Sequence, residues 1–123
     1  MTPTQTPDLR PAIDPQWLER MRTTKPDFLR RLFEVFMSDE PLRVTKIAEA
    51  INAGDLDVVR YLAHSLKGAA ATLGMERVRD ACRTLEMAAK DGETEHLLEG
   101  QQLIAAEMES VYARINETMT PEV

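Results

Sequence analysis

One histidine of this chain stands apart from the apolar residues around it. His64 lies in the run Ala63–Gly74, whose sequence is AHSLKGAAATLG. Apolar residues nearby recur every three or four positions, which predicts a helix whose apolar stripe is centred about 150° away from His64. The stripe consists of Leu56, Val59, Leu62, Leu66, Ala69, Ala70 and Leu73. We therefore expect the imidazole on the solvent-facing side of a helix.

Four residues that share the outward face of the helix with His64 are basic or small. Arg60 precedes it by four positions, Lys67 follows by three and Gly68 by four. Ala71, seven positions on, also leaves this face without bulk. A glycine inside a helix costs about 1 kcal/mol relative to alanine, so it usually marks a close approach by another group. An exposed imidazole between two cations can be reached by a large partner and can hold an anion.

This arrangement suits phosphoryl transfer through histidine. A neutral imidazole is a good nucleophile near neutral pH, because its unperturbed pKa is about 6.5. Lys67 could contact the oxygens of a phosphohistidine, and Gly68 would leave room for the phosphoryl group and a loop of the partner. The sequence offers no acidic cluster for Mg²⁺ beside His64, no glycine-rich ATP loop and no base–nucleophile triad. We expect a phosphoryl carrier without a bound cofactor or autonomous kinase or hydrolase activity, with Mg²⁺ supplied by the partner.

The same periodicity predicts the helices that must position His64, and no strands. The expected helices run from Pro15 to about Thr23, then over about 26–53, 56–73, 76–90 and 95–118. Pro41 falls inside the second, where one apolar phase continues past it, so we predict a single bent helix. Short connections make neighbouring long helices antiparallel. The fold class is therefore all-α: an up-down four-helix bundle with a short additional N-terminal helix.

Length and composition limit what else the chain can be. Its 123 residues fit one domain, with a flexible Thr/Pro-rich tail over 1–12 and the bundle over 13–120. The net charge of −6 disfavours nucleic acid as a partner. The sequence shows neither a membrane span nor a signal peptide, and the single cysteine, Cys82, fits a helical core and a reducing compartment. We expect a cytoplasmic protein.

The run from Ala63 to Gly74 resembles the signature of histidine-containing phosphotransfer (HPt) domains. The matching residues are His64, Lys67, Gly68 and Gly74. The resemblance extends through Leu85-Glu86 to the helical plan of the ordered chain. It implies a bundle with a phosphorylatable histidine exposed midway along a helix. It also implies partners in phosphorelays, namely response-regulator receiver domains and hybrid or sensor histidine kinases: His64 would accept a phosphoryl group from an aspartyl-phosphate receiver and pass it to another.

Two positions depart from the pattern of some family members. Where those members have a second basic residue, this chain has Ala71, so phosphate stabilisation would rest on Lys67 alone. Where some have a glutamine beside the imidazole, this chain has Glu86. That carboxylate could orient the imidazole N–H, or it could be a helix charge facing solvent. Of the two, we expect the solvent-facing position.

The resemblance also implies an apolar docking surface beside His64. Its expected members are Ile13, Trp17 and Met21 from the first helix and Phe28 and Leu32 from the second. For Trp17, fastening the first helix to the bundle is an equal alternative. His96 has no basic or small-residue face around it, and we expect an ordinary surface residue. One exposed docking face suits a monomer.

Two other functions are weighed against the phosphoryl carrier. An adaptor bundle would bind receiver domains without carrying phosphate, and acid-labile phosphate on His64 would distinguish the carrier from it. A metal or small-ligand bundle would need paired inward-facing His/Glu ligands such as repeated Glu-x-x-His sequences, and the chain lacks such a pair. The short chain and its Pro/Thr-rich start favour a free-standing protein over a piece of a hybrid kinase.

Overall fold

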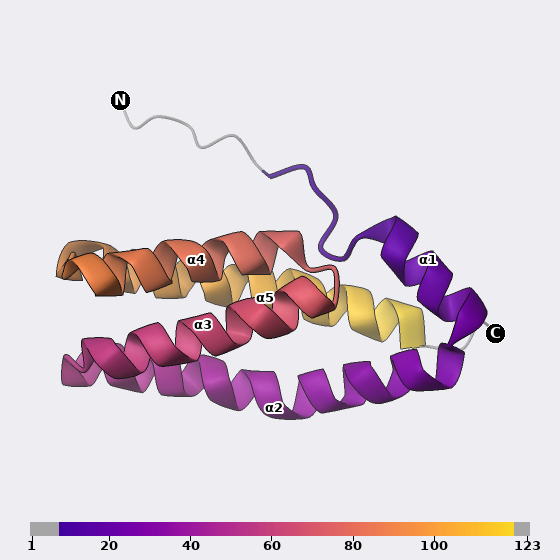
Figure 1. Ribbon diagram of the computed structural model, residues 1–123, viewed down its shortest axis with the longest axis horizontal. Coiled ribbons are helices and arrows are strands. Elements are labelled where there is room, and N and C mark those ends of the chain that lie inside the picture. Colours follow the sequence, from indigo (N-terminus) through magenta and orange to yellow (C-terminus); the bar gives the residue numbers. More distant parts are fainter. Residues whose placement is uncertain (1–7, 120–123) are drawn as a thin grey trace.

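The computed structural model describes residues 8–119, which form five α-helices, one 3₁₀ turn and no strand (Figure 1). The elements are α1 (Pro15–Thr24), α2 (Pro26–Ala53), α3 (Leu56–Thr72), α4 (Glu76–Asp91), η1 (Thr94–His96) and α5 (Leu97–Met119). Every predicted helix is present, and its ends lie within two residues of those expected. The all-α class is confirmed.

Helix starts follow from capping chemistry. The carboxylates of Asp14 and Asp55 accept hydrogen bonds from the free backbone N–H groups at the starts of α1 and α3. Pro15 and Pro26 begin α1 and α2, where the missing N–H of proline has no helical partner to lose. These local signals explain why the helix starts can be predicted from the sequence.

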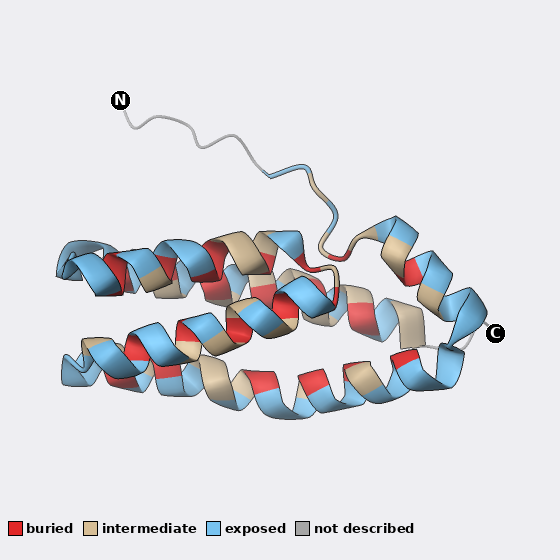
Figure 2. Cartoon of the chain, viewed as in Figure 1, coloured by how far each residue is buried: buried red, intermediate tan, exposed pale blue. Residues whose placement is uncertain are grey.

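The four long helices form the bundle. α3 packs between α2 and α4, and α5 packs against the same two helices, so α3 and α5 lie diagonally opposite each other. Buried residues line the inner faces of all four (Figure 2). Fully buried examples are Phe33 and Ile47 of α2, Leu66 of α3, Leu85 of α4 and Ile104 of α5. Burial of these faces is the main favourable contribution to folding.

α2 continues through Pro41 as one helix of 28 residues, as the continuous apolar phase predicts. Figure 1 shows the helix changing direction near its middle, where Pro41 cannot donate a backbone hydrogen bond. Next to the proline, the buried Glu40 accepts two hydrogen bonds from Nη1 of Arg43, at 2.9 and 3.0 Å. Burial raises the pKa of Glu40 above its ordinary 4.5, although Arg43 acts against this shift.

Gly74 positions α1 on the bundle. Its φ of +69° turns the chain sharply between α3 and α4, and its carbonyl accepts a hydrogen bond from the Asp14 N–H at 2.8 Å. A Cβ at this position would lie 3.3 Å from the Cβ of Asp14. Gly74 therefore serves the fold: it brings the start of α1 against the α3–α4 turn.

The stretch before α1 lies against α4. Arg10 pairs with Asp80 at 2.8 Å, and Arg77 donates a hydrogen bond to the carbonyl of Arg10. Residues 1–7 of the expected tail, and residue 120 at the end of the expected domain, lie outside the described residues. The two domain limits therefore stay predictions.

Two other expectations concern the character of the helices. Cys82 is fully buried in α4, as its apolar neighbours predict, and burial raises its pKa to about 12. None of the helices in the described range is long and apolar enough to cross a membrane. The cytoplasmic location stays a prediction.

Candidate functional site

His64 lies midway along α3 on the solvent side, as the helical pattern predicts. Its side chain is 67% exposed. It borders a hollow of about 390 Å³ on the outer surface of α3 and α4. The hollow is lined by Asp57, Arg60, Tyr61, His64 and Glu86. A partner can therefore reach the imidazole without any movement of the bundle.

Glu86 of α4 contacts the side chains of both His64 and Lys67 of α3. Its Oε1 lies 2.9 Å from Nδ1 of His64, and its Oε2 lies 2.6 Å from Nζ of Lys67. The Glu86 side chain is only 21% exposed. The expected solvent-facing position is therefore wrong. The packing of α4 against α3 directs this carboxylate toward His64, so it occupies the orienting position instead.

The protonation of Glu86 decides the tautomer of His64. Burial by itself raises the pKa of Glu86, but the hydrogen bonds from Lys67 and His64 outweigh burial, and the net pKa lies below the ordinary 4.5. Glu86 is therefore ionised at neutral pH and can only accept hydrogen bonds. Nδ1 of a neutral His64 must then carry the hydrogen, which leaves the lone pair on Nε2. The contact therefore leaves Nε2 as the ring nitrogen with a free lone pair.

The two cations near His64 are not equivalent. Lys67 is held by Glu86, and its side chain is 28% exposed. Arg60 lines the hollow beside His64, and within residues 8–119 it forms no ion pair with a carboxylate. Ala71 is exposed and adds no charge. The cationic face expected from the sequence is therefore reduced to Arg60 while Lys67 remains on Glu86.

Gly68 is exposed one turn beyond His64. A Cβ built at Gly68 would meet no described atom of the chain outside its own turn of helix within 4 Å. Packing inside the protein therefore does not require glycine at this position. Free space above the helix, next to the histidine, is what the glycine provides.

The expected docking residues divide into buried and exposed ones. Ile13 is a core residue with 1% exposure, so its expected contact with a partner is wrong for this conformation: Gly74 holds the start of α1 against the bundle. Trp17 is half-buried, with its ring centroid 6.5 Å from that of Phe33, which fits the fastening alternative. Phe28 is exposed, whereas Met21 and Leu32 are half-buried.

Further exposed apolar residues of α2 and α3 were not predicted from the sequence. They include Val35 and Leu42 of α2 and Tyr61 of α3. Tyr61 lies three positions before His64, a spacing that places it on the same side of the helix. Val35 and Leu42 follow Phe28 at steps of seven, which is also a same-side spacing. These spacings are the sequence signal from which the exposure of the three residues could have been predicted.

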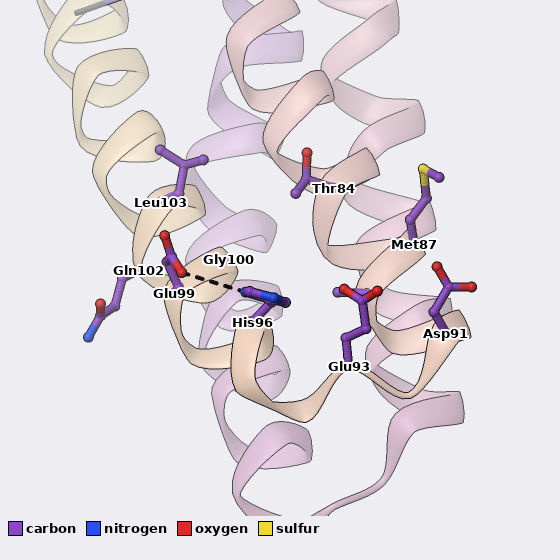
Figure 3. A pocket seen from close by; sticks show the side chains of 10 residues that line it. Thr84, Met87, Asp91, Glu93, His96, Glu99, Gly100, Gln102 and Leu103 are labelled. Atoms are coloured by element: carbon purple, nitrogen blue, oxygen red, sulfur yellow. Dashed lines mark ion pairs between the residues drawn. The ribbon is translucent and has the colours of Figure 1, made fainter. Parts of the chain in front are cut away.

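The second histidine lies elsewhere. His96 borders a hollow of about 670 Å³ between α4 and α5 (Figure 3), and its Nδ1 is 3.8 Å from a carboxylate oxygen of Glu99. The residues lining this hollow include no lysine or arginine. His96 is exposed, as expected for a surface residue. The described residues contain no cluster of histidine, cysteine and carboxylate side chains suited to a metal ion.

Comparisons with known proteins agree with this geometry. A search of curated protein sequences gives no match. Among solved structures, histidine-containing phosphotransfer protein B from Pseudomonas aeruginosa PAO1 is similar with a TM-score of 0.82 and 25% identity, over 88% of this chain and 94% of that one. A histidine-containing phosphotransfer protein from maize has the same fold, with a TM-score of 0.76 and 20% identity over 88% and 82% of the two chains. The Hpt domain family matches residues 31–116, which include His64, Lys67, Gly68 and Glu86. The chain belongs to the Hpt domain family.

Proposed function

We propose that this protein carries a phosphoryl group on Nε2 of His64, taken from the aspartyl phosphate of one receiver domain and delivered to another. The observation that carries the proposal is the contact between Glu86 Oε1 and His64 Nδ1 at 2.9 Å. It holds the hydrogen on the inner nitrogen and leaves the outer nitrogen as a free nucleophile on an exposed side chain. Family membership supplies the class of partner.

The phosphoryl transfer needs no group of this chain to act as an acid or a base. The Nε2 lone pair attacks phosphorus, the P–O bond to the partner's aspartate breaks, and its electron pair leaves with the carboxylate. The ring then bears a positive charge, because Nδ1 keeps its hydrogen while Nε2 is bonded to phosphorus. The Glu86 carboxylate stabilises that charge from 2.9 Å away. The reverse sequence delivers the phosphoryl group.

Lys67 would change partner during this cycle. In the unphosphorylated protein its ammonium group lies 2.6 Å from Glu86 Oε2. A phosphoryl group on the neighbouring ring brings oxygens that compete for the same ammonium. The lysine chain is long and flexible enough to turn from Glu86 toward them. Arg60, on the rim of the hollow, would attract the incoming anionic group.

The proposed carrier takes its metal chemistry from the partner. Mg²⁺ bound in the receiver domain would neutralise the phosphoryl group from the far side as it moves. On this side the chain provides the nucleophile, its orientation and one mobile cation. A single exposed docking face fits a monomer, which remains part of the proposal.

The test is transfer of labelled phosphate. Receiver domains from the source organism are phosphorylated with labelled acetyl phosphate, freed of excess reagent and mixed with the protein. We expect acid-labile, base-stable label on the wild type and none on His64→Gln. The matched control His96→Gln should be labelled like the wild type. Label that persists in His64→Gln would show that His64 is not the phosphorylated residue. Stable binding of a phosphorylated receiver with no label on the protein would favour the adaptor function.

A further inference from the structure

We propose that the partner's footprint runs from His64 across Tyr61 onto the exposed apolar residues of α2. We call this the α2–α3 apolar surface, made of Phe28, Val35, Leu42 and Tyr61. The proposal rests on the phosphocarrier function and states where the receiver domain binds. It places most of the contact on α2 and α3 rather than on α1.

Tyr61 connects the histidine to α2. Its side chain is 71% exposed, an unusual state for a large aromatic residue, and it lines the hollow that contains His64. Tyr61 also lines a second hollow of about 300 Å³ between α2 and α3, which includes Leu42. The two hollows therefore meet at this ring. A molecule that covers His64 from this side covers Tyr61 as well.

The apolar surface continues along α2. Phe28, Val35 and Leu42 are 52%, 53% and 63% exposed and are spaced seven residues apart. Seven residues are close to two turns, so the three side chains follow one side of the helix over about 21 Å. Single exposed apolar residues are ordinary, but a row whose last member, Leu42, shares a hollow with Tyr61 indicates a binding surface.

Continuity with the phosphoryl-transfer site identifies the occupant as the receiver domain. The donor must bring its aspartyl phosphate to Nε2 of His64, and the hollow that His64 lines also includes Tyr61. Tyrosine is among the residues that contribute most to protein–protein affinity when a partner covers them. Arg60 borders the hollow at His64 and offers positive charge to the arriving anionic phosphoryl group.

The other sides of the histidine are less suited to docking. Toward α4, the hollow presents the Glu86 carboxylate, whose charge repels a phosphoryl group. Toward α1, Ile13 is buried, and Trp17 and Met21 are already packed against the core. The exposed apolar area beside His64 therefore belongs to α2 and α3.

The experiment measures phosphotransfer from a phosphorylated receiver domain at subsaturating protein. Tyr61→Ala and Leu42→Ala are compared with Leu98→Ala, a matched control at 56% exposure on α5, which lies diagonally opposite α3. We expect kcat/KM to fall about tenfold for Tyr61→Ala and severalfold for Leu42→Ala, and to stay at the wild-type value for Leu98→Ala. All three side chains are exposed, so each variant should fold, and circular dichroism checks that it does.

A donor that needs no docking separates this proposal from the carrier function. Potassium phosphoramidate is small enough to reach His64 directly, so we expect all variants to be labelled by it at the wild-type rate. Wild-type protein labelled by neither donor would overturn the carrier function itself. Wild-type receiver transfer in both Tyr61→Ala and Leu42→Ala would overturn the footprint and leave the carrier intact. Slower labelling of Tyr61→Ala by phosphoramidate would also overturn it, because the ring would then act on the histidine.

Discussion

Glu86 and His64 are 22 positions apart in the sequence, and Oε1 of the carboxylate lies 2.9 Å from Nδ1 of the imidazole. The second carboxylate oxygen holds Lys67 at 2.6 Å. One acidic residue on α4 therefore sets both the tautomer of His64 and the position of Lys67. The proposed reactive unit extends over two helices, and its geometry depends on how α3 and α4 pack.

Replacement of Glu86 separates these two effects. Glu86→Ala removes the acceptor, and a hydrogen bond to a charged group contributes about 1.5–3 kcal/mol, so we expect the preference for the Nδ1–H tautomer to weaken by about tenfold or more. Nitrogen NMR shifts of the neutral His64 ring report the tautomer directly. Phosphorylation by phosphoramidate should slow in parallel.

Glu86→Gln is the second variant to compare with Glu86→Ala, because it keeps an acceptor but removes the charge. Its amide oxygen can still accept from Nδ1, but it carries no charge to hold Lys67 or to repel a phosphoryl group. We expect the tautomer to persist and the phosphohistidine to hydrolyse more slowly than in the wild type. Equal tautomer populations in wild type, Glu86→Gln and Glu86→Ala would contradict the assigned role of this carboxylate.

Gly68→Ala should improve stability while it impairs transfer. Alanine at an exposed helical position is favoured over glycine by up to about 1 kcal/mol, and no described atom opposes the added methyl group within 4 Å. Urea denaturation should therefore show a higher midpoint. Transfer from a receiver domain should fall, because the methyl group occupies space next to His64, whereas labelling by phosphoramidate should change less. Unchanged receiver transfer would show that the partner does not approach this glycine.

Gly74→Ala tests the contact that holds α1. A left-handed residue other than glycine costs about 1 kcal/mol, and here the new Cβ also lies 3.3 Å from Asp14. Gly92 is the matched control, since its φ of +71° is nearly the same and a Cβ there meets no described atom within 4 Å. We expect Gly74→Ala to lower the free energy of unfolding by about 1 kcal/mol more than Gly92→Ala. Equal losses of unfolding free energy in the two variants would mean that α1 accommodates the new Cβ without destabilising the fold.

Features set by local interactions are the ones that the sequence predicts correctly. Helix limits and the exposure of His64 depend on caps and periodicity, which are local, and both are confirmed. The contact of Glu86 depends on the rotation of α4 against α3, which no spacing within α4 encodes. The burial of Ile13 likewise depends on a turn about 60 positions away in the chain, at Gly74.

The exposed row on α2 was missed for a different reason. Periodicity assigns apolar residues to the core by default, because burial is their usual fate. Val35 and Leu42 lie outside the stripe that contains Phe33, Phe36 and Ile47, so helical phase alone separates them. Apolar residues that fall out of phase with the core stripe are therefore candidates for binding surfaces.

The buried ion pair beside Pro41 gives the fold a defined response to pH. At pH 7, Arg43→Met leaves the Glu40 carboxylate buried without its partner. We expect a loss of about 1–3 kcal/mol in the free energy of unfolding, less than for a fully buried pair because the Arg43 side chain is 29% exposed. Lys46→Met, an exposed change on the same helix, should have little effect. Urea denaturation measures all three proteins.

The sign of the pH dependence follows from the direction of the Glu40 shift. Burial raises the folded-state pKa of Glu40 above its ordinary 4.5, so its contribution to stability is complete below the unfolded pKa and is lost as the pH rises through the folded one. Arg43 opposes this shift, and its removal raises the folded pKa further. The penalty of Arg43→Met should therefore shrink as the pH is lowered from 7 toward the ordinary carboxyl pKa. A penalty that is constant over this range would mean that Arg43 stabilises the bundle by packing alone, and that the charge of Glu40 is compensated elsewhere.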